Sequence, residues 1–256
     1  MQFIDSHCHL DFSEFDLSRK EILLQARAAG VRDIVVPGVI ADRWQDLLSL
    51  IKSDHNLHAA LGLHPCFMAK HTQADLELLK TLLVTEQVCA VGEIGLDLFI
   101  PQANLDQQLL YLNEQLALAK KFNLPVLLHV RKAHDQMLKQ LRLIQLERGG
   151  IVHAFSGSEQ QARQYLDLGF KLGIGGTVTY ERAKKVRRLV QALPLESFVL
   201  ETDAPDMPLA GHQGEINQPA RVRRVAEVIA ELKNISVTKV AEITSQQVKR
   251  LLFSAA

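Results

Sequence analysis

The segment Phe3-Ile4-Asp5-Ser6-His7-Cys8-His9 places two histidines directly after a short apolar run. Seven similar apolar runs follow along the 256-residue chain, and stretches of helical period separate them. This alternation is typical of βα units that build a parallel sheet. We therefore expect eight strands, at Gln2–Asp5, Asp33–Pro37, His58–Leu63, Cys89–Ile94, Pro125–His129, Gly150–His153, Phe170–Gly173 and Phe198–Glu201.

The stretches between these runs have apolar residues at helical spacing. Ser158 and Ser236 precede two of them and are expected to cap helix N-termini. The length is typical of one TIM barrel. We predict a single (β/α)8 domain over residues 1–256 with an extra C-terminal helix. The expected helices lie near Leu17–Ala29, Ala41–Ser53, Gln73–Val84, Leu105–Phe122, His134–Glu147, Glu159–Leu168, Glu181–Ala192, Pro219–Lys233 and Val237–Phe253.

Composition sets limits on the class of protein. No apolar run reaches the roughly 18 residues that a membrane span needs, and the N-terminus lacks the basic region of a secretory signal. Three cysteines without a CxxC pair suit a reducing compartment, so we expect a cytoplasmic protein. The formal net charge is zero, which argues against binding nucleic acid through a broad positive field. Nothing in the sequence indicates a membrane or an obligate protein partner.

Metal-ligand residue types follow strand after strand. In a barrel, the C-terminal ends of the strands converge on one face, where the active sites of such enzymes lie. Each feature alone also has a structural explanation: a chance His-x-His pair, a buried salt bridge for Glu93, or a helix cap for Asp203. Together they are hard to explain in that way, because clustered buried ionisable groups cost free energy unless they are paired or metal-bound. The candidate ligands are His7, His9, Glu93, His129, His153 and Asp203.

The number of candidate ligands favours two metal ions over one. A catalytic zinc site commonly has three protein ligands, whereas six donors fit two ions that share a carboxylate. Imidazole and carboxylate ligands suit Zn, Mn or Mg. We expect two divalent ions per subunit, the first held by His7, His9, Glu93 and Asp203, and the second by Glu93, His129 and His153.

Other polar residues have weaker signals. Arg131 is a candidate contact for an anionic substrate, and His64 is either a phosphate contact or a structural residue. His134 and His71 are expected at the surface. Basic stretches at residues 182–188 and 221–224 are usually solvated helix faces, although either could follow a nucleic-acid backbone. The loop at Ala204–Gln218 is long for a connection, and long loops are often functional.

With these residues assembled, the chain resembles the TatD family of metal-dependent hydrolases, and in particular its YjjV-type members. The matching segments run in the expected order from residue 3 to residue 205: FIDSHCHLD, GLHP, VGEIGLD, LPVLLHVR, VHAFSG, GTVTY and LETDAP. The resemblance implies a TIM barrel with divalent metals, and 3′ exonuclease or other DNase activity in some members. It also assigns the six candidate ligands above as the metal set.

Three positions depart from the family pattern. Leu98-Phe99-Ile100-Pro101 follows GLD where a tyrosine and further polar residues are frequent, Gln218-Pro219 replaces Glu-Pro, and Cys66 stands where another histidine is frequent. These changes lie on the substrate side and leave the metal set intact.

Three functions are compatible with this sequence. The first is phosphoester hydrolysis of DNA ends or short single strands, with Asp203 as the base that activates water and Glu93 between the two ions. The second is amidohydrolase-type cleavage of an amide or lactone, which the missing strand-end lysine disfavours. The third is a metal-stabilised binding protein, which a carboxylate-rich set of six ligands disfavours.

Overall fold

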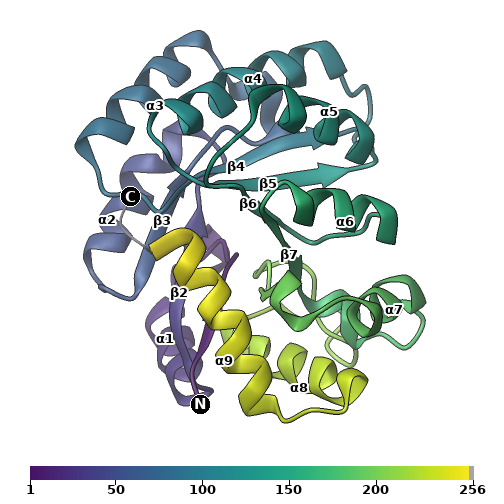
Figure 1. The fold of residues 1–256 in the computed structure, drawn as a ribbon. Helices are drawn as coiled ribbons and strands as arrows, with labels where there is room; N and C mark the ends of the chain where they lie inside the picture. Colours follow the sequence, from purple (N-terminus) through teal and green to yellow (C-terminus); the bar gives the residue numbers. More distant parts are fainter. Residues whose placement is uncertain (254–256) are drawn as a thin grey trace.

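Eight parallel strands lie beside one another in chain order in the computed structural model, which describes residues 1–253. Helices surround them (Figure 1), and the predicted (β/α)8 barrel is confirmed. The strands are β1 (Phe3–Asp5), β2 (Val31–Pro37), β3 (Leu57–Leu61), β4 (Ala90–Asp97), β5 (Val126–Arg131), β6 (Gly150–Val152), β7 (Phe170–Ile174) and β8 (Phe198–Leu200).

The helices occur where their periodicity predicts them. Ser158 and Ser236 cap α6 and α9, because each side chain accepts a hydrogen bond from a backbone N–H three residues later. Within residues 1–253, no helix is both long and apolar enough to span a bilayer. The helices are α1 (Arg19–Ala28), α2 (Trp44–Lys52), α3 (Gln73–Thr85), α4 (Leu105–Lys121), α5 (His134–Ile144), α6 (Glu159–Asp167), α7 (Lys184–Ala192), α8 (Val222–Lys233) and α9 (Val237–Val248).

Strands β4 and β5 run further than expected toward the C-terminal end of the barrel. Their pairing extends through Gly95 opposite His129 and Asp97 opposite Arg131. A Cβ atom at position 95 would lie 1.9 Å from the carbonyl oxygen of His129, so only glycine permits this close approach. The extension carries Glu93, His129 and Asp97 to the same end of the sheet.

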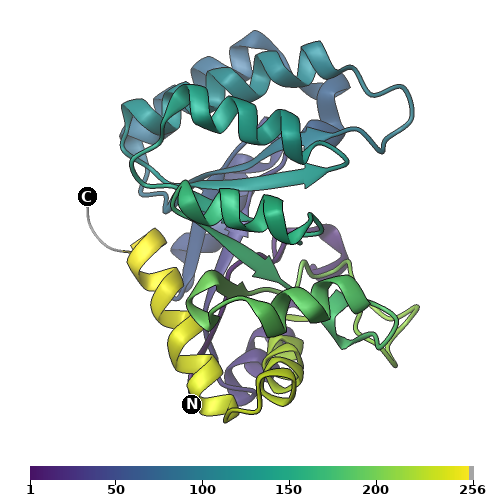
Figure 2. The same cartoon turned by 45° about the vertical axis from the view of Figure 1, so that its right-hand side comes forward.

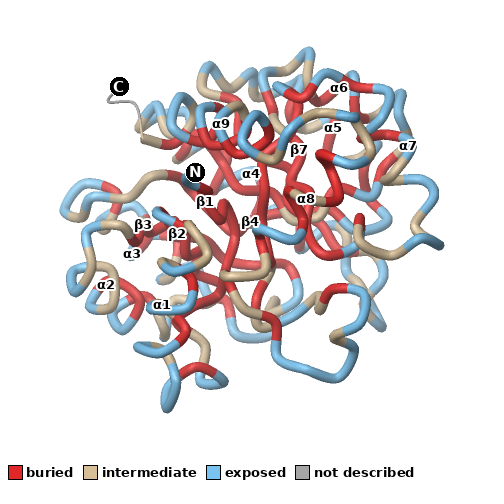
Figure 3. Tube along the Cα trace, turned by 90° about the horizontal axis from the view of Figure 1, so that it is seen from below, coloured by how far each residue is buried: buried red, intermediate tan, exposed pale blue. Residues whose placement is uncertain are grey.

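The hydrophobic core has two layers, one inside the barrel and one between the strands and the helices. Figure 3 shows the buried positions concentrated along the strands and the exposed ones on the outer turns. The inner layer takes one or more apolar side chains from most of the strands. These are Ile4, Val35, Ala60, Ala90, Leu127, Ile151 and Val199, all at most 2% exposed.

The C-terminal part of the chain closes this inner layer. Helix α9, yellow in Figure 1, passes across the front of the strands and packs against β1 and β8. A single helix was predicted at Val237–Phe253. In the structure the α-helix covers Val237–Val248, and Lys249–Phe253 form a π-helical turn that follows it directly. Val248 and Leu252 from this region join the inner cluster.

Two histidines expected at the surface are buried, and that prediction was wrong. His134 begins α5, and its Nδ1 lies 3.2 Å from the hydroxyl of Tyr165, which α6 brings against it. His71 donates a hydrogen bond from Nε2 to the carbonyl of His64 at 2.8 Å. In both cases a contact made on folding engages one nitrogen of the buried imidazole.

Truncating the side chain that closes the barrel should destabilise the fold. We expect Leu252→Ala to lower the free energy of unfolding by about 2–4 kcal/mol, because it leaves a cavity in a closed apolar layer. The control is Leu24→Ala on α1, whose side chain is 66% exposed and should change stability by less than about 0.5 kcal/mol. Urea unfolding measures both. Equal effects would contradict the assigned role of Leu252.

Candidate metal centre

The segments that follow β1 and β8 lie side by side and bring residues from the two ends of the chain together. The backbone of His9 donates to Ala204, and that of Asp203 donates to His7, at 2.8 and 2.9 Å. Asp5 accepts hydrogen bonds from the backbone and hydroxyl of Thr202, at 3.0 and 2.5 Å. These bonds place the imidazoles of His7 and His9 next to the carboxylate of Asp203.

One oxygen of Glu93 faces a first donor group, made of His7, His9, Glu93 and Asp203. Glu93 Oε2 lies 3.1 Å from His7 Nε2 and 3.6 Å from His9 Nε2. The two Nε2 atoms are 3.3 Å apart, and Asp203 Oδ1 lies 3.7 and 3.5 Å from them. Four atoms with lone pairs therefore converge on one small volume.

The other oxygen of Glu93 faces a second donor group, made of Glu93 and His129, with His64 beside them. Glu93 Oε1 lies 3.2 Å from His129 Nδ1 and 3.3 Å from His64 Nε2. The Sγ atom of Cys66 lies close by, 3.4 Å from Asp97 Oδ2. Glu93 is 1% exposed and stands between the two groups, as a bridging carboxylate would.

His153 joins the cluster on the Asp203 side. Its ring stacks on that of His7 with centroids 3.7 Å apart, and its Nε2 lies 3.5 Å from Asp203 Oδ2. The structure thus brings all six predicted ligands together, and it places His153 with His7 and Asp203 rather than with His129. The division of the donors between two ions stays a prediction.

Three of these histidines have an acceptor close to their outer ring nitrogen, and His129 and His9 are hydrogen-bonded to it. His129 Nε2 lies 2.9 Å from Asp97 Oδ2, His153 Nδ1 lies 3.2 Å from Glu201 Oε1, and His9 Nδ1 lies 3.3 Å from the carbonyl of Pro37. An acceptor at the outer nitrogen directs the lone pair of the other nitrogen toward the centre. Metal-ligating histidines are usually held in this way.

The pKa values reflect the same convergence of acceptors. Burial disfavours a charge on Glu93, but His64, His7 and His129 outweigh it and hold the pKa of Glu93 well below its usual range. Burial likewise opposes protonation of His9, yet Asp203 and Glu93 raise its pKa to about 9. The pKa of Asp203 is lowered for similar reasons, chiefly by His153. The ionised carboxylates of Glu93 and Asp203 thus favour a positive charge among the histidines of the cluster.

The residues present fit divalent metal ions. An imidazole lone pair aimed at a carboxylate oxygen is unfavourable unless a proton or a cation lies between them. Donors at 2.0–2.2 Å from a tetrahedral zinc ion are about 3.3–3.6 Å apart, which matches most separations in the first donor group. Imidazole and carboxylate are ligands for Zn, Mn or Mg.

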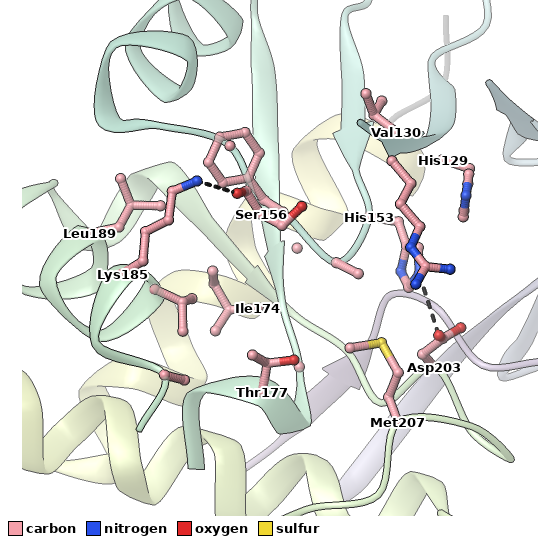
Figure 4. Close-up of a pocket in the computed structure, with 18 residues that line it drawn as sticks. His129, Val130, His153, Ser156, Ile174, Thr177, Lys185, Leu189, Asp203 and Met207 are labelled. Carbon is pink, nitrogen blue, oxygen red and sulfur yellow. Dashed lines mark hydrogen bonds and ion pairs between the residues drawn. The ribbon is translucent and has the colours of Figure 1, made fainter. Parts of the chain in front are cut away.

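A cavity of about 520 Å³ opens beside the donors (Figure 4). His129, His153 and Asp203 line one end of it, and α7 lines the other. In Figure 2 the arrowheads of the teal and green strands point to the side from which the loops project, so this is the C-terminal face of the barrel. The loop at Ala204–Gln218 contributes Met207 to the cavity wall.

A family model described as TatD related DNase matches residues 4–253. The chain belongs to the TatD family. It is 46% identical over 243 residues to the "Uncharacterized metal-dependent hydrolase YjjV" of Escherichia coli (strain K12), and the match covers 94% of each chain. A relative from Bacillus subtilis (strain 168), "Uncharacterized metal-dependent hydrolase YabD", is 36% identical over 96% of this chain and 97% of its own.

Solved TatD structures have the same architecture. The crystal structure of YjjV, a TatD homologue from Escherichia coli K12, superposes with a TM-score of 0.96 at 44% identity, covering 99% of this chain and 98% of that one. A TatD family hydrolase from Entamoeba histolytica shares the fold at 20% identity, with a TM-score of 0.87 over 100% of this chain and 99% of that one.

The two residues predicted to contact substrate lie in different places. Arg131 is exposed, lines the cavity and stacks its guanidinium 3.8 Å from the ring centroid of Phe99, one of the departures from the TatD pattern. His64 is buried and does not line this cavity. Its Nδ1 accepts from the backbone of Cys66, so neutral His64 carries its proton on Nε2 and donates to Glu93. His64 thus orients the carboxylate.

Sequence reasoning missed Asp97 and Glu201, which hold His129 and His153. Each lies in a TatD segment that was singled out for another carboxylate, Asp97 with Glu93 in VGEIGLD and Glu201 with Asp203 in LETDAP. A second buried acid within such a segment is the signal that could have identified them.

Removing the carboxylate that orients His129 should weaken metal binding. We expect Asp97→Asn to lower the affinity for Zn²⁺ about 10–100-fold, the usual cost of losing an outer partner of a ligating histidine. Asp33→Asn is a matched control, because Asp33 makes a similar contact with His58 (3.0 Å), away from the donors. Chelator competition measures both affinities. Equal losses would remove Asp97 from the site.

Metal affinity should rise with pH up to about pH 9. In the metal-free protein the raised pKa of His9 keeps that imidazole protonated below this value, and a metal must displace the proton. Each displaced proton should add about tenfold to the affinity per pH unit. Calorimetry of Mn²⁺ binding between pH 6 and 9, in buffers of different ionisation enthalpy, counts the released protons. An affinity independent of pH would contradict this assignment.

Proposed function

We propose that this chain is a metal-dependent hydrolase that cleaves phosphoesters, with DNA ends or short single strands as substrates. The position of Glu93 carries the proposal, because its two oxygens face two separate donor groups. Membership of the TatD related DNase family and the similarity to relatives named metal-dependent hydrolases support the reaction class.

Two divalent ions would be held by residues of the cluster. His7, His9, Glu93 and Asp203 are the proposed ligands of one ion, and Glu93, His129 and His153 those of the second. Bound Zn, Mn or Mg ions would supply Lewis acidity, neutralising phosphate charge and lowering the pKa of water. His64 and Asp97 would act by orienting Glu93 and His129.

Asp203 is the proposed general base. Its Oδ1 faces His7 and His9, while its Oδ2 faces His153 and the carboxylate lines the cavity. Because its pKa is held well below the usual range, it is ionised at neutral pH. Asp203 can thus orient a water molecule in the cavity and accept its proton during attack on phosphorus.

Arg131 is the proposed contact for the non-bridging oxygens of the substrate. It lies at the end of β5, two residues beyond His129, and lines the same cavity. Stacking on Phe99 leaves the edge of a guanidinium free to donate hydrogen bonds, which suits a phosphate group.

The amidohydrolase-type alternative lacks a supporting side chain. A lysine that bridged two ions would have to lie among the donors, but Lys132 lies beyond the end of β5, with its Nζ 5.9 Å from the ring centroid of Phe99. Turnover on a panel of phosphodiesters, phosphomonoesters, amides and lactones separates the two reactions, and no metal-dependent turnover at all would indicate a binding protein.

Asp203→Asn should separate chemistry from metal binding. The amide keeps an oxygen ligand and the shape of the side chain but cannot accept the proton, so we expect turnover of the preferred phosphodiester to fall by about 10²-fold or more. Metal analysis should still find bound ions. Glu93→Ala is the contrasting variant, which should lose both metal and activity because it faces both donor groups. Unchanged turnover in Asp203→Asn would exclude it as the base.

A further inference from the structure

The cavity beside the donors is larger than a phosphate group needs. Its volume of about 520 Å³ is within the range of small-molecule sites, roughly 300–1,000 Å³. Figure 4 shows His153 and Asp203 on one side, Lys185 and Leu189 on the other, and Ile174 between them. A substrate whose reacting group lies at the donors would therefore place its attached group in this cavity.

The walls of this cavity are mostly apolar. Phe155, Ile174, Val186, Leu189 and Met207 line it, and Asp203 at the reacting end is its one carboxylate. Such walls suit an uncharged flat group that is buried by hydrophobic contact. A sugar phosphate or a free polyphosphate offers no group of that kind.

Helix α7 and the turn before it carry three exposed cations, one of which, Lys185, lines the cavity. Lys185 and Arg188 are neighbours on the helix surface at i, i+3 spacing, and Arg182 lies in the turn before the helix, with its guanidinium 5.2 Å from the ring centroid of Tyr180. All three are exposed, and Lys185 lines the cavity and donates from Nζ to the carbonyl of Ser156 at 2.6 Å. We call Arg182, Lys185 and Arg188 the α7 row.

The α7 row differs from the other basic stretch in having no carboxylate partners. In residues 1–253 none of its three side chains makes an ion pair, and Glu181, the neighbouring acid, makes none with them. On α8, in contrast, Arg223 and Arg224 pair with Glu227 at 3.3 and 3.2 Å. The charge of α8 is thus balanced within the helix, whereas that of α7 is available to an anion.

From these observations we infer that the cavity and the α7 row form one subsite for a single nucleic-acid strand. A base occupies the apolar cavity, and the phosphates that follow the reacting group lie along Arg182, Lys185 and Arg188. The inference rests on the proposed phosphoester substrate and specifies it, because only an anionic chain bearing flat apolar groups matches both surfaces. A protein of zero net charge can hold such a chain because a few local cations suffice.

Binding to the metal-free protein in EDTA tests the subsite without turnover. We compare Lys185→Gln/Arg188→Gln with Arg223→Gln/Arg224→Gln, which removes the same number of exposed cations from α8. Fluorescein-labelled (dT)8 is the probe. We expect the α7 variant to bind it about five- to tenfold more weakly and the α8 variant to bind within twofold of the parent. The salt slope of the α7 variant should fall by about 1.4, at ~0.7 per lost phosphate contact on a single strand.

Two further probes test the cavity. An abasic octamer and inorganic polyphosphate keep the anionic chain but lack bases, so the parent should bind both more weakly than (dT)8. Thr177→Trp fills the cavity from an exposed position and should weaken (dT)8 binding while leaving polyphosphate binding unchanged. Thermal melting checks that each variant is folded.

Each outcome separates this inference from the proposed activity. If the α7 variant binds (dT)8 as the parent does, or if polyphosphate binds as tightly as (dT)8, the subsite is overturned, whatever the metal-loaded enzyme cleaves. If the α7 variant alone loses strand affinity and the loaded enzyme cleaves no phosphodiester, the subsite stands and the proposed hydrolysis fails.

Discussion

The buried carboxylate of Glu93 is the constraint on which the rest of the site depends. A charge with 1% exposure is stable only if its surroundings compensate for the lost water. The barrel provides that compensation from both sides, with His7 on one oxygen and His64 and His129 on the other. The glycine at position 95 contributes to this arrangement, because it lets β4 approach β5 at His129, one of the rings that face Glu93.

The charge of the molecule is arranged locally. Imidazoles and carboxylates make up the donor groups, whereas Lys185 on α7, a cation without a carboxylate partner among residues 1–253, lines the cavity. Elsewhere on the surface opposite charges pair locally, such as Arg163 with Glu159 and Arg224 with Glu227. Although the net charge is zero, acidic residues at the donor groups and a basic residue on α7 are therefore separated at the C-terminal face of the barrel.

Features that repeat along the chain could be predicted from the sequence. The strands recur with the same apolar composition, and their polar ends identify His7, His9, Glu93, His129, His153 and Asp203 without knowledge of their contacts. What depends on tertiary partners could not be predicted. His134 is buried because Tyr165 packs against it, and Asp97 matters because β4 lies beside β5. The basic stretches at 182–188 and 221–224 look alike in sequence, and only the contacts separate a paired face from an unpaired one.

The closure of the barrel by Val248 and Leu252 has a consequence for biosynthesis. Both side chains are translated after all eight strands, yet the inner apolar layer is incomplete without them. A nascent chain that has emerged only through β8 therefore exposes the apolar interior of the barrel to water and to chaperones. Because the segments that follow β1 and β8 also join through backbone hydrogen bonds such as Ser6 to Leu200, native contacts of long range form only late, a pattern associated with slow folding. The predicted ligands His7 and His9 are therefore synthesised long before Asp203, beside which they lie in the folded chain.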